Sequence, residues 1–199
     1  MPPDVPEDLN FLLATPFRYH PLQYGSRFGT RTEGGIWYGA DSRETCLAEV
    51  AYYLLVFLED SDADLLPRTR NYSLFQAAVR TKLCVDVGEV ASAKDRALIC
   101  SPTTYEVSQE LGTQMRADGI EVVRYPSARD PSHGMNVGVF SWKAFAAKDP
   151  ISSAYETWLC SVSRTKDVLF THDRVTTPER RSFPHGVFLV GGKLPIPAA

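Results

Sequence analysis

The segment TCLAEVAYYLLVFL, from Thr45 to Leu58, contains one charged side chain, Glu49. A helix that is apolar on nearly every face is usually buried, so this segment favours a globular fold built around it. Within such a helix a carboxylate must be paired, line a cleft, or cost several kcal/mol of desolvation. Glu49 is therefore either a structural group, in an ion pair with an arginine or on one exposed edge of the helix, or a pocket carboxylate that stabilises positive charge.

The rest of the composition is that of a soluble globular protein. The 199 residues are 44% hydrophobic and 23% charged, close to the average for one domain. The net charge of −3 provides no basic surplus, so no direct nucleic-acid partner is expected. The longest apolar run, residues 50–58, is too short to span a bilayer, and the acidic N-terminus lacks the basic region of a signal peptide. We therefore expect no membrane association and a cytoplasmic location.

Cysteine and histidine are too scattered to predict a metal site. No pair of cysteines has the C-x-x-C spacing, and no two histidines are four residues apart. We expect no metal, buried and reduced thiols, and histidines on the surface or in loops. The cysteines are Cys46, Cys84, Cys100 and Cys160, and the histidines are His20, His133, His172 and His185.

Local patterns predict more strand than helix. A Pro-rich arm or first turn is expected over residues 1–16, and a helix with a capping box begins at Asp41 or Ser42 and ends near Leu58. A second helix begins at Thr104 and ends before Gly119. Strands are expected over 17–19, 36–38, 72–87 (one strand or a hairpin), 120–125, 137–142, 155–162 and 168–171, with a loop over 20–35 and a loop-like tail from 178 apart from 187–190. The predicted class is α+β: one domain over 17–199, with a mixed or antiparallel sheet and flanking helices.

Two short motifs contain polar groups that suit ligand binding. Arg27 and Arg31 flank Phe28-Gly29-Thr30, and guanidinium forks beside a glycine suit phosphate or carboxylate, although most loop arginines are simply solvated. The loop lacks the glycine spacing of a P-loop or a Rossmann fingerprint. Ser127 follows Tyr-Pro without the G-x-S-x-G pattern of a hydrolase nucleophile. It is expected either to form a hydrogen bond in a site or to be a plain turn residue.

Taken in order along the chain, these features resemble the RES domain family, which is named for its arginine, glutamate and serine. The resemblance rests on RFGTR (27–31), IWYGADSRETCLAEV (36–50), DGIEVVRYPSARD (118–130) and NVGVF (136–140), and covers residues 17 to 145. It implies an ADP-ribosyltransferase-like fold. The functional set that it implies is Arg27, Arg31, Tyr38, Glu49 and Ser127. The chain departs from the family after Arg31, where many members have an aromatic residue and this sequence has Thr32-Glu33, which brings a negative charge near the implied phosphate site.

Members of this family are typically toxins of bacterial toxin–antitoxin pairs that consume NAD⁺. The resemblance therefore implies that residues 17–199 are a RES-like domain that cleaves the nicotinamide–ribose bond, with water or inorganic phosphate as acceptor. NAD⁺ is then a substrate, and no cofactor is expected. The implied partner is an antitoxin with an Xre-like helix-turn-helix region that covers the active site.

The residues themselves agree with this chemistry. Nicotinamide leaves NAD⁺ without a general acid, so the site must mainly stabilise an oxocarbenium-like transition state, which is the expected task of Glu49. Arg27, and after it Arg31, would bind the pyrophosphate, Tyr38 would stack on nicotinamide or a ribose, and Ser127 would hydrogen-bond the ribose or the amide.

Two other function classes remain open at the level of the sequence. One is an ADP-ribosyltransferase that modifies a macromolecular target through the same site. The other is a non-catalytic binding module in which Glu49 and Arg27 form a buried ion pair. The sequence also makes no choice between hydrolysis and phosphorolysis, because either acceptor is small and needs no motif.

Overall fold

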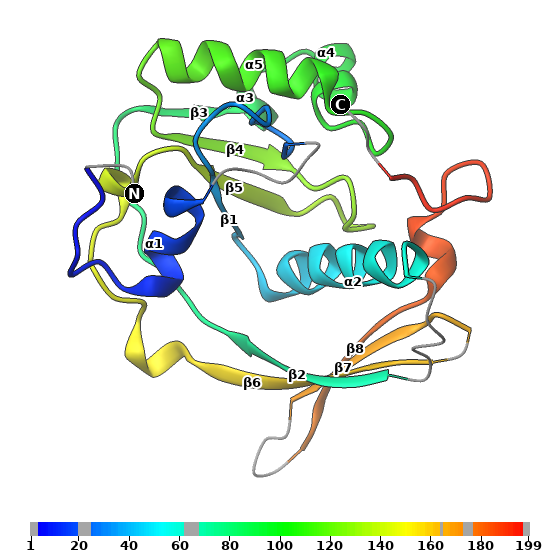
Figure 1. Ribbon diagram of the computed structural model, residues 1–199. Helices are drawn as coiled ribbons and strands as arrows, with labels where there is room; N and C mark the ends of the chain where they lie inside the picture. Colours follow the sequence, from blue (N-terminus) through cyan, green and yellow to red (C-terminus); the bar gives the residue numbers. More distant parts are fainter. Residues whose placement is uncertain (1–3, 20–24, 62–67, 164, 173–176, 197–199) are drawn as a thin grey trace.

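The chain folds around helix α2 (Arg43–Glu59), which lies between two four-stranded sheets (Figure 1). The computed structural model describes residues 4–19, 25–61, 68–163, 165–172 and 177–196. Helices flank both sheets, so the predicted α+β class is confirmed. The strands form two sheets, one mixed and one antiparallel.

The first sheet positions most of the residues that the sequence motifs contain. Its order is β1 (Trp37–Ala40), β5 (Met135–Val139), β4 (Val122–Pro126) and β3 (Cys84–Asp86). β3 and β4 run parallel, whereas the other pairs are antiparallel. Tyr38 pairs with Gly138, and Asn136 pairs with Tyr125. Because side chains alternate between faces along a strand, Tyr38, Asn136 and Tyr125 share one face of this sheet.

The second sheet is antiparallel and provides the main core beneath α2. Its order is β2 (Arg68–Leu74), β6 (Glu156–Val162), β7 (Val168–His172) and β8 (Glu179–Phe183). The inward side chains of β6, β7 and β8 pack against α2; they include Trp158, Cys160, Val162, Val168, Phe170 and Phe183. This contact explains why so much of α2 is apolar.

Helix α2 presents apolar residues to two different surroundings. Ser42 begins it as predicted, with its Oγ accepting a hydrogen bond from the Thr45 N–H at 3.1 Å. Leu47, Ala51, Leu55 and Leu58 are buried against the second sheet. The opposite face borders a cavity, which its apolar and aromatic side chains line together with Glu49. Charged residues are therefore few on this face too. Within the described ranges, no helix is both long enough and apolar enough to cross a membrane.

The remaining helices cover the first sheet. α3 (Val87–Val90), α4 (Ala93–Ile99) and α5 (Glu106–Ala117) pack on the face that includes Val123 and Tyr125. α1 (Phe11–Arg18) packs on the opposite face, against Val122 and Val139. Gly119 follows α5 with φ +73°, as expected of a glycine that ends a helix. Short 3₁₀ turns occupy 142–144, 152–154 and 185–188.

The N-terminal region differs from the predicted arm. Residues 11–18 form α1, and 17–19, predicted as a strand, are the end of that helix and the residue after it. Val5, Leu9, Leu13 and Phe17 are buried together. Leu13 and Phe17, four residues apart, form the buried face of α1, and the prolines obscured this helical spacing. Residues 1–3 of the expected arm, and 20–24 of the expected loop, lie outside the described residues.

Other local expectations were wrong where long-range pairing decided the outcome. Residues 72–87 are not a hairpin, because β2 and β3 belong to different sheets. The tail after 178 contains β8, which pairs with β7. Residues 187–190, predicted as a strand, begin within a 3₁₀ turn over 185–188 and form only an isolated bridge at Val190. All four cysteines are free, but only Cys160 is buried.

Candidate active site

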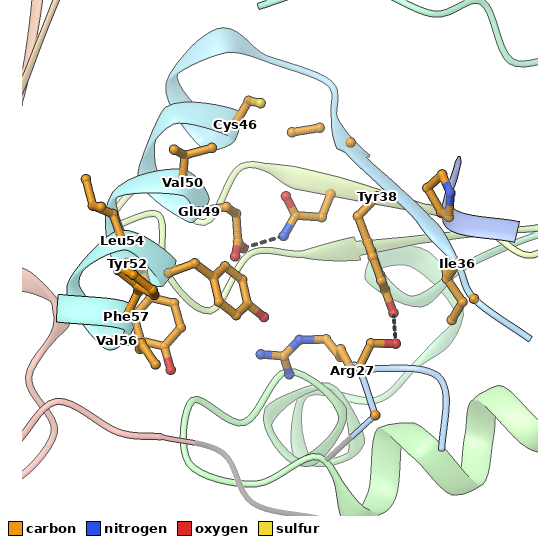
Figure 2. Close-up of a pocket in the computed structure, with 18 of the residues that line it drawn as sticks. Arg27, Ile36, Tyr38, Cys46, Glu49, Val50, Tyr52, Leu54, Val56 and Phe57 are labelled. Atoms are coloured by element: carbon orange, nitrogen blue, oxygen red, sulfur yellow. Dashed lines mark hydrogen bonds between the residues drawn. The ribbon is translucent and has the colours of Figure 1, made fainter. Parts of the chain in front are cut away.

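A cavity of about 880 Å³ lies beside α2, within the size range of small-molecule sites. It is bordered by α2, by the loop before β1, by β1 itself and by β2, with Asn136 and Tyr125 from the first sheet. Arg27, Tyr38 and Glu49 all line it, and Figure 2 shows their side chains converging on the same space. The structure thus brings together three of the five residues that the sequence motifs predicted.

Glu49 projects from the cavity-facing side of α2. Its Oε1 accepts two hydrogen bonds, from Ser127 Oγ at 2.7 Å and from Asn136 Nδ2 at 2.6 Å. Among the described residues, no arginine or lysine forms an ion pair with this carboxylate, so the expected structural ion pair is not what holds it. Two neutral donors fix the carboxylate in place, and Arg27 acts on it only through space.

Ser127 lies behind Glu49 and does not line the cavity. It is 1% exposed, and its Oγ accepts hydrogen bonds from the backbone N–H groups of Arg129 and Asp130, at 3.0 and 2.9 Å. A hydroxyl that already accepts two bonds has one hydrogen to donate, and this hydrogen goes to Glu49. Ser127 therefore orients the carboxylate from a fixed turn at the end of β4.

Arg27 is almost completely buried in the wall of the cavity. Its Nη1 donates to the carbonyl oxygens of Ile99 and Ser101, at 3.1 and 3.0 Å. Its guanidinium lies 4.7 Å from the ring centre of Tyr105 and 5.9 Å from that of Tyr125. Burial acts to lower the pKa of Arg27, but the Tyr105 and Tyr125 phenols, with Glu49, outweigh it and raise the pKa above its ordinary value. The cation is thus permanent.

One face of α5 holds the loop that carries Arg27. Gln109 Nε2 donates to the Ser26 carbonyl at 3.1 Å, and Arg116 Nη2 donates to the Gly34 carbonyl at 2.7 Å. Between them Gly112 lies against the backbone of Phe28, so closely that a Cβ there would meet the Phe28 oxygen at 2.0 Å. A helix face with spacing i, i+3, i+7 therefore sets the position of Arg27.

Tyr38 connects β1 to the same loop. Its hydroxyl forms a hydrogen bond with Ser26 Oγ at 2.9 Å (Figure 2). It also accepts one from the Phe28 N–H at 3.2 Å. Burial raises the pKa of Tyr38 to about 12. The phenol is therefore neutral at physiological pH, and its ring forms part of the cavity wall.

Arg31, in contrast, is exposed and is not among the described residues that line the cavity. Glu33, whose charge was unexpected beside a phosphate site, is turned away from the cavity. It accepts hydrogen bonds from the Thr30 N–H at 2.7 Å and from Thr113 Oγ1 at 2.8 Å. Within this loop, Arg27 therefore faces the cavity, whereas Arg31 faces solvent.

Sequence reasoning missed several cavity residues. Asn136 lies inside the NVGVF motif but was not singled out, although it bonds directly to Glu49. Tyr53 and Phe57 follow Glu49 at steps of four on α2, and this spacing was a usable signal. No local signal indicated Arg68 and Arg70, which reach the cavity from β2 of the second sheet.

The cavity tyrosines predict a loss of stability at high pH. Burial raises the pKa of Tyr125 well above its ordinary value, as it raises that of Tyr38 to about 12. In the unfolded chain both phenols ionise near pH ~10, so between about pH 10 and 12 the folded state binds more protons. The stability they contribute is complete below pH ~10 and is lost as pH rises through the folded pKa.

Urea unfolding across this pH range, with tyrosine ionisation followed by ultraviolet absorbance, tests this expectation. The free energy of unfolding should fall while part of the tyrosine absorbance change lags behind that of free tyrosine. Replacing both residues with phenylalanine should remove part of the pH dependence, because burial also raises the pKa of Tyr52 and Tyr53. An unfolding free energy that is level up to pH ~12 would contradict it.

Histidine and cysteine form no metal centre within the part of the chain that is described. No three His, Cys, Asp or Glu side chains there lie close enough together to hold a metal ion. His20 falls outside the described residues. The described residues that line the cavity include one carboxylate, Glu49, together with several tyrosines and arginines.

Comparison with known proteins identifies the same family that the order of the motifs along the chain indicated. No curated protein matches the chain. The model of the RES domain family matches residues 3–161, most of the chain and all of the motifs that surround the cavity. The match begins ahead of α1 and ends within β6. The chain belongs to the RES domain family.

Proposed function

We propose that this protein is a toxin-type enzyme that cleaves the nicotinamide–ribose bond of NAD⁺ and transfers the ADP-ribosyl group to water or inorganic phosphate. Membership in the RES domain family supports a toxin-type function related to NAD⁺. The observation that carries the proposal is Glu49, a carboxylate held by two neutral donors in a cavity whose other charged lining residues, among those described, are arginines.

Glu49 stabilises the positive charge that develops on the ribose as the glycosidic bond breaks. The bonding electrons leave with nicotinamide, which becomes neutral, so no proton has to be supplied to the leaving group. Water or phosphate then forms the new bond to the ribose carbon, and water releases one proton as it does so. A fixed carboxylate in a partly enclosed site is more effective here than in bulk water, because its orientation costs nothing during the reaction.

The remaining predicted residues receive complementary roles in the proposal. Arg27, a permanent cation in the cavity wall, binds the substrate through the N–H groups that the Ile99 and Ser101 carbonyls do not use. The ring of Tyr38 packs against nicotinamide or its ribose. Ser127, buried behind Glu49, acts as a positioning residue and does not touch the substrate.

The cellular part of the proposal rests on the family alone. A toxin that depletes NAD⁺ must be neutralised in the cell that makes it, which calls for a cognate antitoxin. An Xre-like antitoxin that covers the cavity meets this need, and NAD⁺ depletion implies action in the cytoplasm. Co-expression with an Xre-like antitoxin that binds this chain should allow growth of cells that the enzyme alone arrests.

NAD⁺ consumption by the purified chain, with and without inorganic phosphate, tests the biochemical function. Loss of NAD⁺ only with phosphate, yielding ADP-ribose-1″-phosphate by mass spectrometry, indicates a phosphorylase. Loss without phosphate, yielding ADP-ribose, indicates a glycohydrolase. Nicotinamide release that requires an added macromolecule would instead favour an ADP-ribosyltransferase, and no loss under any of these conditions would refute the proposal.

A further inference from the structure

The charged residues that line the cavity are unbalanced in sign. Among the described lining residues, three are cationic, Arg27, Arg68 and Arg70, and one is anionic, Glu49. The chain as a whole has a net charge of −3, so this excess of positive charge is local. A cavity with such an excess favours a ligand that carries more than one negative charge.

Arg68 and Arg70 occupy alternate positions on β2 and therefore point to the same side of the second sheet. Tyr72 and Leu74, the next residues in this alternation, pack against the core around α2, which shows that the shared side faces inward. β2 is the edge strand of this sheet in the described structure. Both guanidiniums are thus placed at the rim of the cavity by strand geometry.

Neighbouring aromatic rings hold the two arginines without neutralising them. The Arg68 guanidinium lies 5.6 Å from the ring centre of Phe57, and that of Arg70 lies 5.8 Å from the ring centre of Tyr72. Among the residues described, neither arginine forms an ion pair with a carboxylate, whereas Arg43 and Arg124 each do. Stacking of this kind orients a guanidinium and leaves its N–H groups available for oxygen acceptors.

Arg68 lies at a different end of the cavity from Glu49, and Arg70 follows it two residues further along β2. Phe57, which contacts Arg68, is two turns of α2 beyond Glu49, or about 12 Å along the helix axis. A dinucleotide that places its reactive ribose at Glu49 extends past this distance with its second nucleoside. The position of Arg68 and Arg70 therefore corresponds to the phosphate-bearing part of such a ligand.

We infer that Arg68 and Arg70 form an anion subsite that binds the pyrophosphate of the dinucleotide substrate on its adenosine side. The inference rests on the proposed function for the identity of the substrate. It assigns to β2 the role that the sequence suggested for Arg31, which the structure leaves outside the cavity. Paired guanidiniums bind phosphate oxygens through charge-assisted hydrogen bonds, which a single buried Arg27 cannot provide for two phosphates.

The test is the double variant Arg68→Gln/Arg70→Gln, compared with Arg180→Gln. Arg180 is an exposed arginine on β8 of the same sheet, and its neighbour Arg181 pairs with Glu44 of α2, so Arg180 points away from the cavity. Steady-state kinetics are measured with NAD⁺ and with nicotinamide riboside, which lacks phosphate. Binding of ADP and of adenosine is measured by calorimetry, which does not require turnover.

We expect the double variant to raise KM for NAD⁺ by about tenfold or more and to weaken ADP binding similarly, while kcat changes by less than roughly threefold. Turnover of nicotinamide riboside and binding of adenosine should be unchanged, and Arg180→Gln should behave as the wild type. The subsite would be overturned if the wild type is active and the double variant keeps the wild-type KM for NAD⁺ and the wild-type affinity for ADP. A change confined to the KM for inorganic phosphate would also overturn it, because the arginines would then bind the acceptor.

The subsite and the proposed function can fail separately. A wild-type protein that consumes no NAD⁺, yet binds ADP in a manner that depends on Arg68 and Arg70, would support the subsite and refute the enzyme. A wild-type protein that neither consumes NAD⁺ nor binds ADP at millimolar concentration would refute both.

Discussion

Replacing Glu49 with glutamine is expected to lower NAD⁺ cleavage by about 10³-fold while the protein stays folded. Glutamine keeps the size of the side chain, and its amide oxygen can accept the hydrogen bonds that Ser127 and Asn136 donate to Oε1. The negative charge that stabilises the oxocarbenium-like transition state is lost. A loss of this size corresponds to about 4 kcal/mol of transition-state stabilisation.

A matched substitution on the same helix controls for the change of charge. Glu44→Gln lies in the first turn of α2, outside the cavity lining, where Glu44 pairs with Arg181 on the surface. It should cost at most about 1 kcal/mol of stability and leave kcat/KM close to that of the wild type. Nicotinamide release measured under saturating NAD⁺ separates the two variants. Near-normal turnover by Glu49→Gln would remove this carboxylate from the mechanism.

The same variant separates the enzyme from a non-catalytic module. In the module, Glu49 and Arg27 would form a buried ion pair, and breaking it would cost about 3–5 kcal/mol of stability. The observed donors to Glu49 are neutral, and Arg27 donates to backbone carbonyls. We therefore expect the unfolding midpoint of Glu49→Gln to remain near that of the wild type. A loss of several kcal/mol without any NAD⁺ binding would favour the module.

Gly112→Ala is expected to destabilise the protein by about 3 kcal/mol, although alanine is the better helix former. In an open helix interior this substitution stabilises by about 1 kcal/mol. Here the added Cβ would meet the Phe28 carbonyl oxygen at 2.0 Å and the carbon at 2.7 Å, both of them backbone atoms that cannot rotate away. Either α5 or the 25–34 loop must shift, and the loop carries Arg27.

Gly34→Ala provides the matched control for this substitution. A Cβ at Gly34 would meet only Arg116 Nη1, at 3.9 Å, which is an ordinary contact. We expect a change in stability within about 0.5 kcal/mol and normal turnover. For Gly112→Ala, urea unfolding should give the lower midpoint, and NAD⁺ cleavage should fall as Arg27 is displaced. A higher midpoint than that of the wild type would show that the space between α5 and Phe28 accommodates the added methyl group.

Much of the local structure could be predicted because it depends on neighbours in the chain. The N-terminus of α2 follows from Ser42, whose hydroxyl caps a group three residues away. The end of α5 follows from Gly119, which accepts a positive φ without strain. The apolar run around Glu49 predicted both the central helix and the residue of greatest chemical interest.

Other features depend on contacts between distant segments and could not be predicted in this way. Glu49 is held by Ser127 and Asn136, which lie 78 and 87 residues further along the chain. The motifs indicated Ser127 as a ligand contact, whereas burial makes it a support for the carboxylate. Asn136 was overlooked because an asparagine in a strand has no local pattern that marks it.

Capping and apolar periodicity act within a few residues, so the start of α2, its burial and the carboxylate within it could all be predicted from the amino-acid sequence. Three other features depend on tertiary contacts: residues 72–87 divide between two sheets, Arg31 faces outward, and Arg68 and Arg70 reach the cavity. The pairing of β-strands is set by hydrogen bonds and side-chain packing across long separations in sequence, which no local pattern encodes.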